Sequence, residues 1–390
     1  MIRVLIIAYT DYTYDARVRR HAEALALRGD RVDVIALDTT KCGSCNGVNV
    51  LAIEIARYRG SSRTRYLSTY ASFFAQASLI GLRRSLSNRY DIVVVCTMPD
   101  AAVISAIPLK LLGSKVVLDI HDTMPELYLD KFGGRGGAFG ARLLMAQERI
   151  SALLADRVIA VHDPHRARLM RSGIPENKIS VILNSPDNKA FSPISPPPTD
   201  NGVEFPIVCH GLISRRLGLD VAIEAMSLIR DRVPAARLTV IGDGESLASA
   251  ISLTGKLNLA DRVRFLGRLP LEQLPQILAR AKVGLVPNRA SETTHLMLPV
   301  KLLEYAALRI PAIASRLHTI EHYFGPDAVL FFKPGQPASL ADAIEELWRN
   351  PGRRSALVRN AEGVLDKLNW PSQRTNYYRT IDTLVGNLTA

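Results

Sequence analysis

The sequence predicts an α/β protein made of two doubly wound, Rossmann-like domains. Two observations predict it: Val- and Ile-rich segments alternate with helical segments twice along the chain, and one proline-rich segment separates the two series. Near-continuous apolar strands joined by helices are typical of parallel sheets that are covered on both faces. A length of 390 residues also exceeds what one hydrophobic core usually supports. We expect an interdomain cleft, with ligands bound there at the carboxyl ends of the strands.

The first domain is expected to span residues 1–190. Its apolar, strand-like segments are IRVLIIA, RVDVIAL, NVLAIEI, DIVVVC, KVVLDI, RVIAV and KISVIL. Helical periodicity over residues 16–28, 101–112 and 138–154 separates several of these segments. Parallel strands need such crossover connections, so a parallel sheet is predicted here.

Residues 191–205, FSPISPPPTDNGVEF, are rich in proline and polar residues and predict a linker. The second domain, residues 206–370, repeats the alternation with the strands PIVCHG, RLTVIGDG, RVRFLG, VGLVP and IPAIAS. Its helices are expected at 219–230, near 247–256 and at 271–281. The last segment, 371–390, predicts an amphipathic helix outside this pattern, which we expect to pack back on the first domain.

The composition is that of a globular protein, with 47% hydrophobic and 22% charged residues. Four cysteines are few for a disulfide scaffold, and the single C-x-x-C pattern, Cys42 and Cys45, is interpreted as an ordinary turn in preference to a metal or redox site. The apolar N-terminal segment is interpreted as a strand, not a signal peptide, and no run of about 18 apolar residues predicts a membrane span. We therefore expect a cytoplasmic location.

The formal net charge of +12 predicts an anionic partner, such as a phosphorylated ligand or a membrane surface. Nucleic acid is not expected, because no nucleic-acid-binding motif accompanies the charge. Residues 55–90 contain no acid, and arginines flank the segment YLSTYASFFAQASLIGL. This pattern suits a helix lying on an anionic membrane, but a core helix with solvated basic ends produces the same pattern. The residues expected to face a membrane are Arg63, Arg65, Phe73, Phe74, Arg83 and Arg84.

The segment LPVKLLEYAALRIPAIAS, residues 298–315, predicts a helix followed by a buried strand. Pro299 suits the first turn of the helix, and Lys301 and Glu304 are neighbours three residues apart on a side away from its packed face. Two interpretations are open at this stage. The pair is either a surface ion pair or part of a ligand site at the helix N-terminus.

Four segments in this order, HGLISRRLGLDVAIEAM, ARLTVIGDGES, DRVRFLGRLPLEQLPQILARAKVGLVP and LPVKLLEYAALRIPAIAS, resemble the nucleotide-sugar-binding half of family 4 glycosyltransferases. YDARVRRHAEALALRGDRVDVIAL, VVLDIHDTMPELY and SGIPENKISVILNSPDNKAF are similar to the first half of the same family, so the resemblance covers nearly the whole chain. It implies the GT-B fold and a retaining transfer from a nucleotide-diphospho-sugar. The implied acceptor is a hydroxyl. The arginine-flanked aromatic segment within residues 55–90 suggests that this acceptor is membrane-associated, such as a polyprenyl-diphosphate-linked saccharide, with the protein at the inner face of the membrane.

The resemblance also implies roles for residues of the second domain. A diphosphate needs cations and helix N-termini, which Arg216, with Arg215 beside it, and Lys301 would supply. Glu304 is implied to accept the ribose hydroxyls, as in the family branch with a P-x-K-x-x-E-Y pattern. The remaining sugar-donor contacts are expected from Gly242, Gly244, Arg268 and Leu298.

In the first domain, His121 follows the strand KVVLDI and is implied to lie near the transferring sugar. Asp122 and Glu126 flank it and are expected either to act on the acceptor or to cap the next helix. Asp15 and Arg17 follow the first strand, where relatives have a glycine-rich loop. Arg17 is expected either to contact the sugar donor or to form a structural pair with Asp15.

Two departures keep alternatives open. Leu296 stands where the family commonly has a second glutamate, which contacts the sugar. A nucleotide-sugar 2-epimerase of similar architecture is one alternative, although its chemistry would need carboxylates at that position; a non-catalytic nucleotide-sugar-binding protein is the other. No D-x-D pair is present, so neither a metal nor another cofactor is expected.

Overall fold

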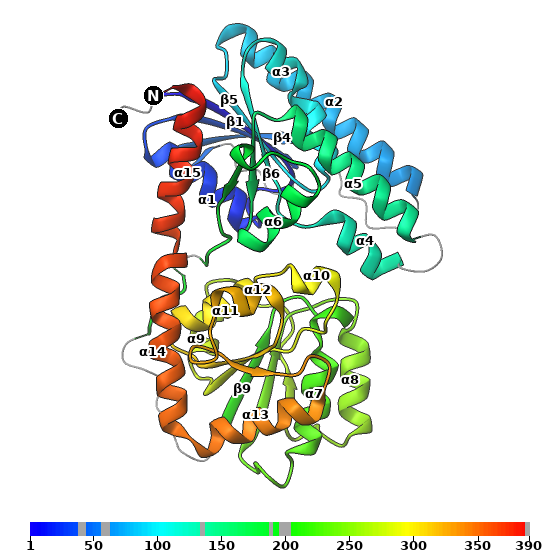
Figure 1. The fold of residues 1–390 in the computed structure, drawn as a ribbon, viewed down its shortest axis with the longest axis vertical. Helices are drawn as coiled ribbons and strands as arrows, with labels where there is room; N and C mark the ends of the chain where they lie inside the picture. Colours follow the sequence, from blue (N-terminus) through cyan, green and yellow to red (C-terminus); the bar gives the residue numbers. More distant parts are fainter. Residues whose placement is uncertain (38–43, 56–62, 133–136, 187–189, 195–203, 387–390) are drawn as a thin grey trace. The chain divides into compact units, whose positions relative to one another are not determined.

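The computed structural model describes the chain except residues 38–43, 56–62, 133–136, 187–189, 195–203 and 387–390. It divides into two compact units (Figure 1), the first made of Met1–Asn184 with Gln373–Ala390 and the second of Ser185–Ser372. The first boundary therefore falls before the proline-rich segment that was expected to be the linker. Each unit is a parallel α/β sandwich, which confirms the predicted fold class.

The first unit contains an eight-stranded sheet with the order β3-β4-β2-β1-β5-β6-β7-β8. All neighbours pair in parallel except the short β3, which is antiparallel to β4. Cys45 in β3 is disulfide-bonded, whereas Cys42 lies outside the described residues. The strands are β1 (Arg3–Asp11), β2 (Arg31–Leu37), β3 (Ser44–Cys45), β4 (Val48–Ile53), β5 (Ile92–Cys96), β6 (Lys115–Asp119), β7 (Arg157–Ala160) and β8 (Ile179–Val181).

Helices cover both faces of this sheet. Alternate residues of β1 enter two different core clusters, Leu5 and Ile7 on one face and Val4 and Ile6 on the other. The expected helix at 101–112 is a 3-10 helix, η1, followed by the short α3, which has a proline in its first turn. The helices are α1 (Ala16–Leu27), α2 (Arg63–Ser87), η1 (Asp100–Ala106), α3 (Ile107–Leu111), α4 (Met124–Phe132), α5 (Gly137–Leu154), α6 (Asp163–Arg171) and η2 (Glu176–Lys178).

Helix α15 (Trp370–Val385) lies almost wholly in the first unit and packs beside α1. The ring of Tyr377 stacks on that of His21 at 4.4 Å between centroids, and the Tyr378 hydroxyl donates to the carbonyl of Ala24 at 2.6 Å. Arg28 pairs with Asp382 at 2.8 Å. The end of the chain thus completes the core on the α1 face of the sheet.

Helix α2 has its aromatic side turned to the core. Phe73 is fully buried and packs edge-on against Tyr9, with ring centroids 5.1 Å apart, while Phe74 is half-buried against the same cluster. The prediction that Phe73 faces a membrane is therefore wrong, because the sheet lies beneath that side of the helix.

The arginines of α2 have separate surroundings. Arg65, Arg83 and Arg84 are all exposed. Nη1 of Arg84 also lies 3.9 Å from Oδ2 of Asp33. The side chain of Arg63 lies outside the described residues. No helix in the described part of the chain is long and apolar enough to cross a bilayer.

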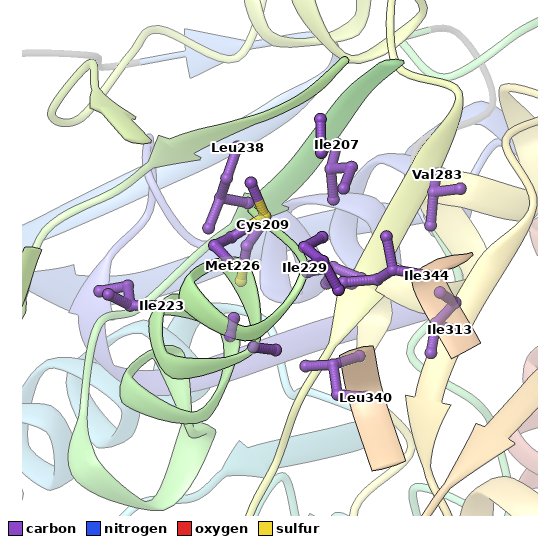
Figure 2. Packing of buried hydrophobic residues seen from close by; sticks show 14 of the residues in the cluster. Ile207, Cys209, Ile223, Met226, Ile229, Leu238, Val283, Ile313, Leu340 and Ile344 are labelled. Atoms are coloured by element: carbon purple, nitrogen blue, oxygen red, sulfur yellow. The ribbon is translucent and has the colours of Figure 1, made fainter. Parts of the chain in front are cut away.

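The second unit has a six-stranded sheet, parallel throughout, with the order β11-β10-β9-β12-β13-β14. Figure 2 shows its core, where Ile207 and Leu238 of the strands meet Met226 of α7 and Ile344 of α13. The strands are β9 (Phe205–His210), β10 (Ala236–Ile241), β11 (Val263–Phe265), β12 (Val283–Val286), β13 (Ala312–Ser315) and β14 (Leu330–Phe332). The helices are η3 (Arg215–Leu217), α7 (Leu219–Leu228), α8 (Leu247–Lys256), α9 (Leu274–Leu278), α10 (Glu292–His295), α11 (Val300–Ala307), α12 (His318–Tyr323), α13 (Pro337–Arg349) and α14 (Pro351–Leu368).

The burial of Phe73 predicts a large stability effect. Phe73→Ala should lower the free energy of unfolding by about 3–5 kcal/mol, because it removes a large side chain from a packed core. Leu67→Ala is the matched control on the same helix, since Leu67 is 68% exposed, and it should change stability by less than about 0.5 kcal/mol. Urea denaturation followed by circular dichroism measures both. Equal effects of the two changes would contradict the assignment of Phe73 to the core.

Candidate functional site

A cavity of about 420 Å³ lies at the carboxyl ends of β9 and β10 in the second unit. Parallel strands end at the same edge of a sheet, so the loops after these two strands come together there. The cavity is lined by His210, Gly211, Leu212, Ile241, Gly242, Asp243, Gly244, Arg268, Leu269 and Leu274.

Two of the predicted glycines shape this cavity. Gly242 has φ +143° and Gly244 has φ +156°, and a Cβ added at either would lie 1.9 Å from the carbonyl oxygen of Gly211 or 2.2 Å from that of Ile213. The loop after β10 therefore lies directly against the loop after β9, which only glycine permits. Gly242 and Gly244, which were expected to contact the sugar donor, thus lie close to the backbone of the chain's own neighbouring loop.

Glu304 of α11 is held by His210, the last residue of β9. Oε2 of Glu304 lies 2.7 Å from Nε2 of His210, and Nδ1 of His210 lies 2.9 Å from the Tyr305 hydroxyl. Among the described residues, no carboxylate lies within 4 Å of the Lys301 ammonium, so the interpretation of Lys301 and Glu304 as a surface ion pair is wrong.

The protons of this group follow from its geometry. Burial, with Cys209 and Glu304 nearby, raises the pKa of Tyr305 well above its ordinary value, so its hydroxyl keeps its proton. The acceptors within reach of that hydroxyl are Nδ1 of His210 at 2.9 Å and the carbonyl oxygens of Val208 and Leu285 at 3.4 and 3.5 Å. Because a carboxylate oxygen only accepts, Nε2 of His210 is the donor to Oε2 of Glu304. No described residue donates to the other oxygen of Glu304, Oε1, which leaves this oxygen able to accept from a ligand.

The positively charged residues that were predicted to bind the sugar donor lie in different surroundings. Nη1 of Arg216 lies 3.0 Å from Sδ of Met297, which precedes the half-buried Leu298 and stands four residues before Lys301 in the chain. Lys301 is half-buried and near enough to Cys209, in β9, to offset part of the rise that burial causes in the pKa of that thiol. Arg215 is instead exposed and lines a separate groove of about 310 Å³ beside α7 and α8. Arg268 is exposed at the cavity.

The sequence prediction missed His210, together with several buried polar groups at the same edge of the sheet. The amide of Asn288, after β12, and the hydroxyl of Ser315, the last residue of β13, are fully buried without a hydrogen-bond partner in the described structure. Such groups are rare unless water or a ligand satisfies them. The signal was present, because a polar residue closes an apolar strand in each of PIVCH, VGLVPN and IPAIAS.

In the first unit, the fully buried Asp119 at the end of β6 binds three side chains. Arg17 donates from Nη2 to Oδ1 at 2.7 Å and from Nε to Oδ2 at 3.3 Å. His121 Nε2 lies 3.1 Å and His21 Nδ1 3.3 Å from Oδ2. Burial alone would raise the pKa of Asp119, but Arg17 and the histidines outweigh it and hold that pKa well below its usual value.

This arrangement corrects two predictions. Arg17 is 4% exposed and is bound to Asp119 and to the carbonyl of Ile182, so it neither pairs with Asp15 nor reaches a ligand. Asp15 caps α1 by accepting from the backbone N–H of Val18 at 3.0 Å.

The two carboxylates near His121 differ in their exposure and in their partners. Asp122 is exposed, whereas Glu126 binds Arg168 through two hydrogen bonds of 2.7 and 3.1 Å. Arg168 also binds the buried Glu148 of α5. Glu126 therefore ties α4 to α6 and neither caps α4 nor remains available to an acceptor.

One group of metal-ligating side chains occurs in the described part of the chain. Atoms of Cys96, Asp119 and His121 lie within 4.8 Å of one another. Both oxygens of Asp119 already bind the Arg17 cation, and burial raises the pKa of the Cys96 thiol. These residues do not fit a divalent cation, which would need a free carboxylate and a thiolate.

The fold of the second unit and its cavity indicate the general class of protein. A Rossmann-like unit with a glycine-shaped cavity at its strand ends is the architecture of nucleotide-binding domains. Residues 14–185 match the model of a Glycosyl transferase 4-like domain, and residues 198–364 match that of Glycosyl transferases group 1. The chain therefore carries a Glycosyl transferase 4-like domain followed by a Glycosyl transferases group 1 domain, and the predicted family is confirmed at the level of these two domains. Membership of the P-x-K-x-x-E-Y branch stays a prediction.

The relatives agree with this assignment. An uncharacterised glycosyltransferase of Methanocaldococcus jannaschii is 25% identical over 387 residues, which are 94% of this chain and 93% of the relative. A GDP-mannose-dependent alpha-(1-6)-phosphatidylinositol monomannoside mannosyltransferase of Mycolicibacterium smegmatis is 29% identical over 189 residues, 46% of this chain. The chain spans only about half (47%) of the length of that second relative.

Solved structures share the fold over nearly the whole chain. A sucrose-phosphate synthase from Thermosynechococcus elongatus superposes with a TM-score of 0.81 at 19% identity, covering 99% of this chain and 100% of that chain. Anabaena HepE in complex with UDP and glucose has a TM-score of 0.74 at 16% identity and covers 99% of this chain and 100% of its own. These likenesses confirm the GT-B fold.

The buried His21 predicts a pH-dependent stability. Burial lowers its pKa from 6.5 to about 4, although the hydrogen bond to Asp119 opposes the shift. Between these pH values the unfolded chain binds more protons than the folded one, so stability rises with pH across that window and falls on acidification. At about 1.4 kcal/mol per pH unit, the shift corresponds to roughly 3 kcal/mol.

His21→Gln should therefore flatten the rise in unfolding free energy between pH 4 and 6.5, because glutamine does not titrate. His322→Gln is the control, since His322 is exposed in the second unit and its removal should leave the profile unchanged. Urea midpoints at half-unit pH steps measure the effect. A His21→Gln profile as steep as that of the wild type would exclude His21 as its source.

Proposed function

We propose that the protein is a retaining glycosyltransferase, which transfers a sugar from a nucleotide-diphospho-sugar to an acceptor hydroxyl. The carrying observation is the open end of the His210–Glu304 pair. It presents a carboxylate oxygen without a partner in the described structure, one turn of helix from Lys301 and beside the 420 Å³ cavity that His210 lines. A carboxylate with a free oxygen suits vicinal ribose hydroxyls, and a cation at the start of a helix suits a diphosphate. HepE, which has the same fold, binds UDP.

Each group has a chemical role in this proposal. Glu304 accepts from the ribose hydroxyls, while the loops of the cavity, with Gly242, Gly244 and Arg268, receive the base and ribose. Arg216, Lys301 and the N-terminal amides of α11 neutralise the diphosphate. As the bond to the sugar breaks, negative charge grows on the leaving diphosphate, and these groups stabilise it more than they stabilise the ground state.

No protein nucleophile is needed in this scheme. The acceptor hydroxyl attacks from the face that the diphosphate leaves, and the departing phosphate oxygen takes its proton. His121 is proposed to contact the sugar, because its Nε2 is held by Asp119 while no described residue binds its Nδ1. We also propose that the reaction needs no metal ion, because two cations and the helix dipole supply the positive charge that the diphosphate requires.

The acceptor is proposed to be a membrane-bound glycan intermediate, such as a polyprenyl-diphosphate-linked saccharide, and the protein a peripheral one on the cytoplasmic face. The net charge of +12 supports an anionic surface as a partner. The mannosyltransferase relative, whose named substrate is a phosphatidylinositol mannoside, supports a lipid-linked acceptor.

A thermal-shift panel of UDP-, GDP- and ADP-sugars tests the proposal. One nucleotide should raise the melting temperature, and NMR of the product formed with an added acceptor should show the anomeric configuration of the sugar donor. Turnover of the nucleotide sugar without acceptor, giving an epimer, would show an epimerase. Binding without any turnover would show a non-catalytic protein, and inversion would refute the retaining mechanism.

Glu304→Ala should weaken binding of the free nucleoside diphosphate by about 1.5–3 kcal/mol, the usual value of a hydrogen bond to a charged group. His210→Ala should also weaken it, because His210 orients Glu304, and the double variant should be no weaker than Glu304→Ala alone. Isothermal titration calorimetry measures the three dissociation constants. With a 2′,3′-dideoxy nucleotide the effect of Glu304→Ala should vanish, and a full effect there would contradict the ribose role.

Arg216→Ala and Lys301→Ala should lower kcat more than they weaken binding of the sugar donor, by about 10²-fold or more, as for the loss of one transition-state charge contact. Arg215→Ala is the matched control, because Arg215 lines a different groove and should leave kcat nearly unchanged. Steady-state kinetics at saturating sugar donor measure kcat for the three variants. Unchanged kcat in both test variants would rule out the diphosphate role.

A further inference from the structure

Helix α5 in the first unit has large apolar side chains on its solvent side. Phe139 is 77% exposed, Leu143 63% and Ile150 59%. The side that faces the protein buries the small residues Gly137, Ala141, Ser151 and Ala152, together with Glu148. The helix is therefore amphipathic in the reverse sense, since a surface helix normally turns its large apolar residues inward.

The neighbouring elements extend this apolar surface. The 3-10 helix η1 contacts both α2 and α5, and α3 contacts α2; Figure 1 shows α2, α3 and α5 on the same side of the sheet. Leu111 of α3 is 83% exposed. Beside it, a groove of about 340 Å³ is lined almost wholly by apolar residues, namely Val103, Ile107, Lys110, Leu111, Val116, Leu153 and Leu154.

Further large apolar side chains are exposed on these elements and at their ends: Leu79, Leu86, Ile104, Leu112, Met145, Leu153 and Leu154. Single exposed apolar residues need no explanation, but a concentration over adjacent helices marks a surface that binds something apolar.

The charges on the same surface identify the partner. Arg142 and Arg149 are exposed on the outer side of α5, and Arg65 and Arg83 are exposed on α2. The described residues of α2, η1, α3 and α5 present no exposed carboxylate, since Glu148 is buried against Arg168 and Asp100 is buried in η1. This combination of large apolar side chains and arginines, without acids, fits an anionic lipid bilayer. The apolar side chains enter the membrane interface, and the arginines bind the anionic headgroups.

We propose that the outer side of α5, with η1 and α3, docks onto an anionic membrane. Phe139, Leu143 and Ile150 enter the interface between headgroups and acyl chains, and Arg142 and Arg149 bind lipid phosphates. In this proposal, α5 makes the membrane contact that the sequence predicted for the aromatic side of α2. This inference rests on the proposed function only in the idea that the acceptor is membrane-bound, and its test needs neither sugar donor nor acceptor.

Co-sedimentation of the full chain with vesicles is the test. Wild-type protein should bind vesicles of phosphatidylcholine with 30 mol% phosphatidylglycerol about tenfold or more tighter than pure phosphatidylcholine, and 0.5 M salt should weaken that binding. The triple change Phe139→Ser, Leu143→Ser and Ile150→Ser should lower binding at least tenfold. Leu228→Ser with Ile251→Ser is the matched control, because both residues are about half-exposed in the second unit, and it should bind like the wild type.

Two charge variants locate the contact. Arg142→Gln with Arg149→Gln should remove most of the salt-sensitive binding, whereas Arg65→Gln with Arg83→Gln on α2 should remove less. The proposal is overturned if the folded triple variant binds anionic vesicles like the wild type. It is equally overturned if wild-type protein ignores vesicles and elutes as a dimer that the triple variant dissociates, which would make this surface a self-association interface. Nucleotide binding, measured by calorimetry on the same variants, should be unchanged, which separates this result from the proposed transfer reaction.

Discussion

Each parallel sheet is buried on both faces, and this constraint places the candidate chemistry of the molecule at the ends of the strands. Neighbouring residues of β1 alternate between two apolar clusters, so neither side of the strand meets water. A polar side chain inside such a strand needs a buried partner, as Asp33 of β2 has in Asn49 and Tyr90, and without one its burial costs several kcal/mol. Asp119, His210 and Ser315 are accordingly the last residues of β6, β9 and β13.

The two units treat their buried polar groups differently. Both oxygens of Asp119 are bound by Arg17, with two histidines adding to Oδ2, so this cluster is closed and orients His121. The pair of His210 and Glu304 is open, because the carboxylate keeps an oxygen that no described residue binds, next to a cavity. A closed cluster stabilises a fold and positions a side chain, whereas an open one can bind a ligand.

Helices α2 and α5 show how similar segments reach opposite environments. Both are apolar and carry arginines, but α2 turns its aromatic side to the sheet while α5 buries small residues and leaves Phe139 and Leu143 outside. Small residues let α5 approach η1 closely. Packing against the neighbouring elements therefore decides which residues of each helix remain on the surface.

The sequence by itself determined the two parallel sheets, most of their strands and the position of the helix that carries Glu304. Those features depend on local periodicity and on residues close in the chain. It also predicted the two glycosyltransferase domains, because the spacing of several segments is itself a sequence property. Segments after residue 315 were less clear, and β14, α13 and α14 were not expected from their pattern.

Only the tertiary structure decided the partners of the charged residues. Arg17 binds Asp119, which is 102 positions away, and Glu304 binds His210, which is 94 positions away. Glu126 likewise binds Arg168 across 42 positions. A charged side chain near a strand end has the same local sequence whether it binds a ligand or a distant residue, since the choice depends on which groups the folded sheet brings within about 3 Å.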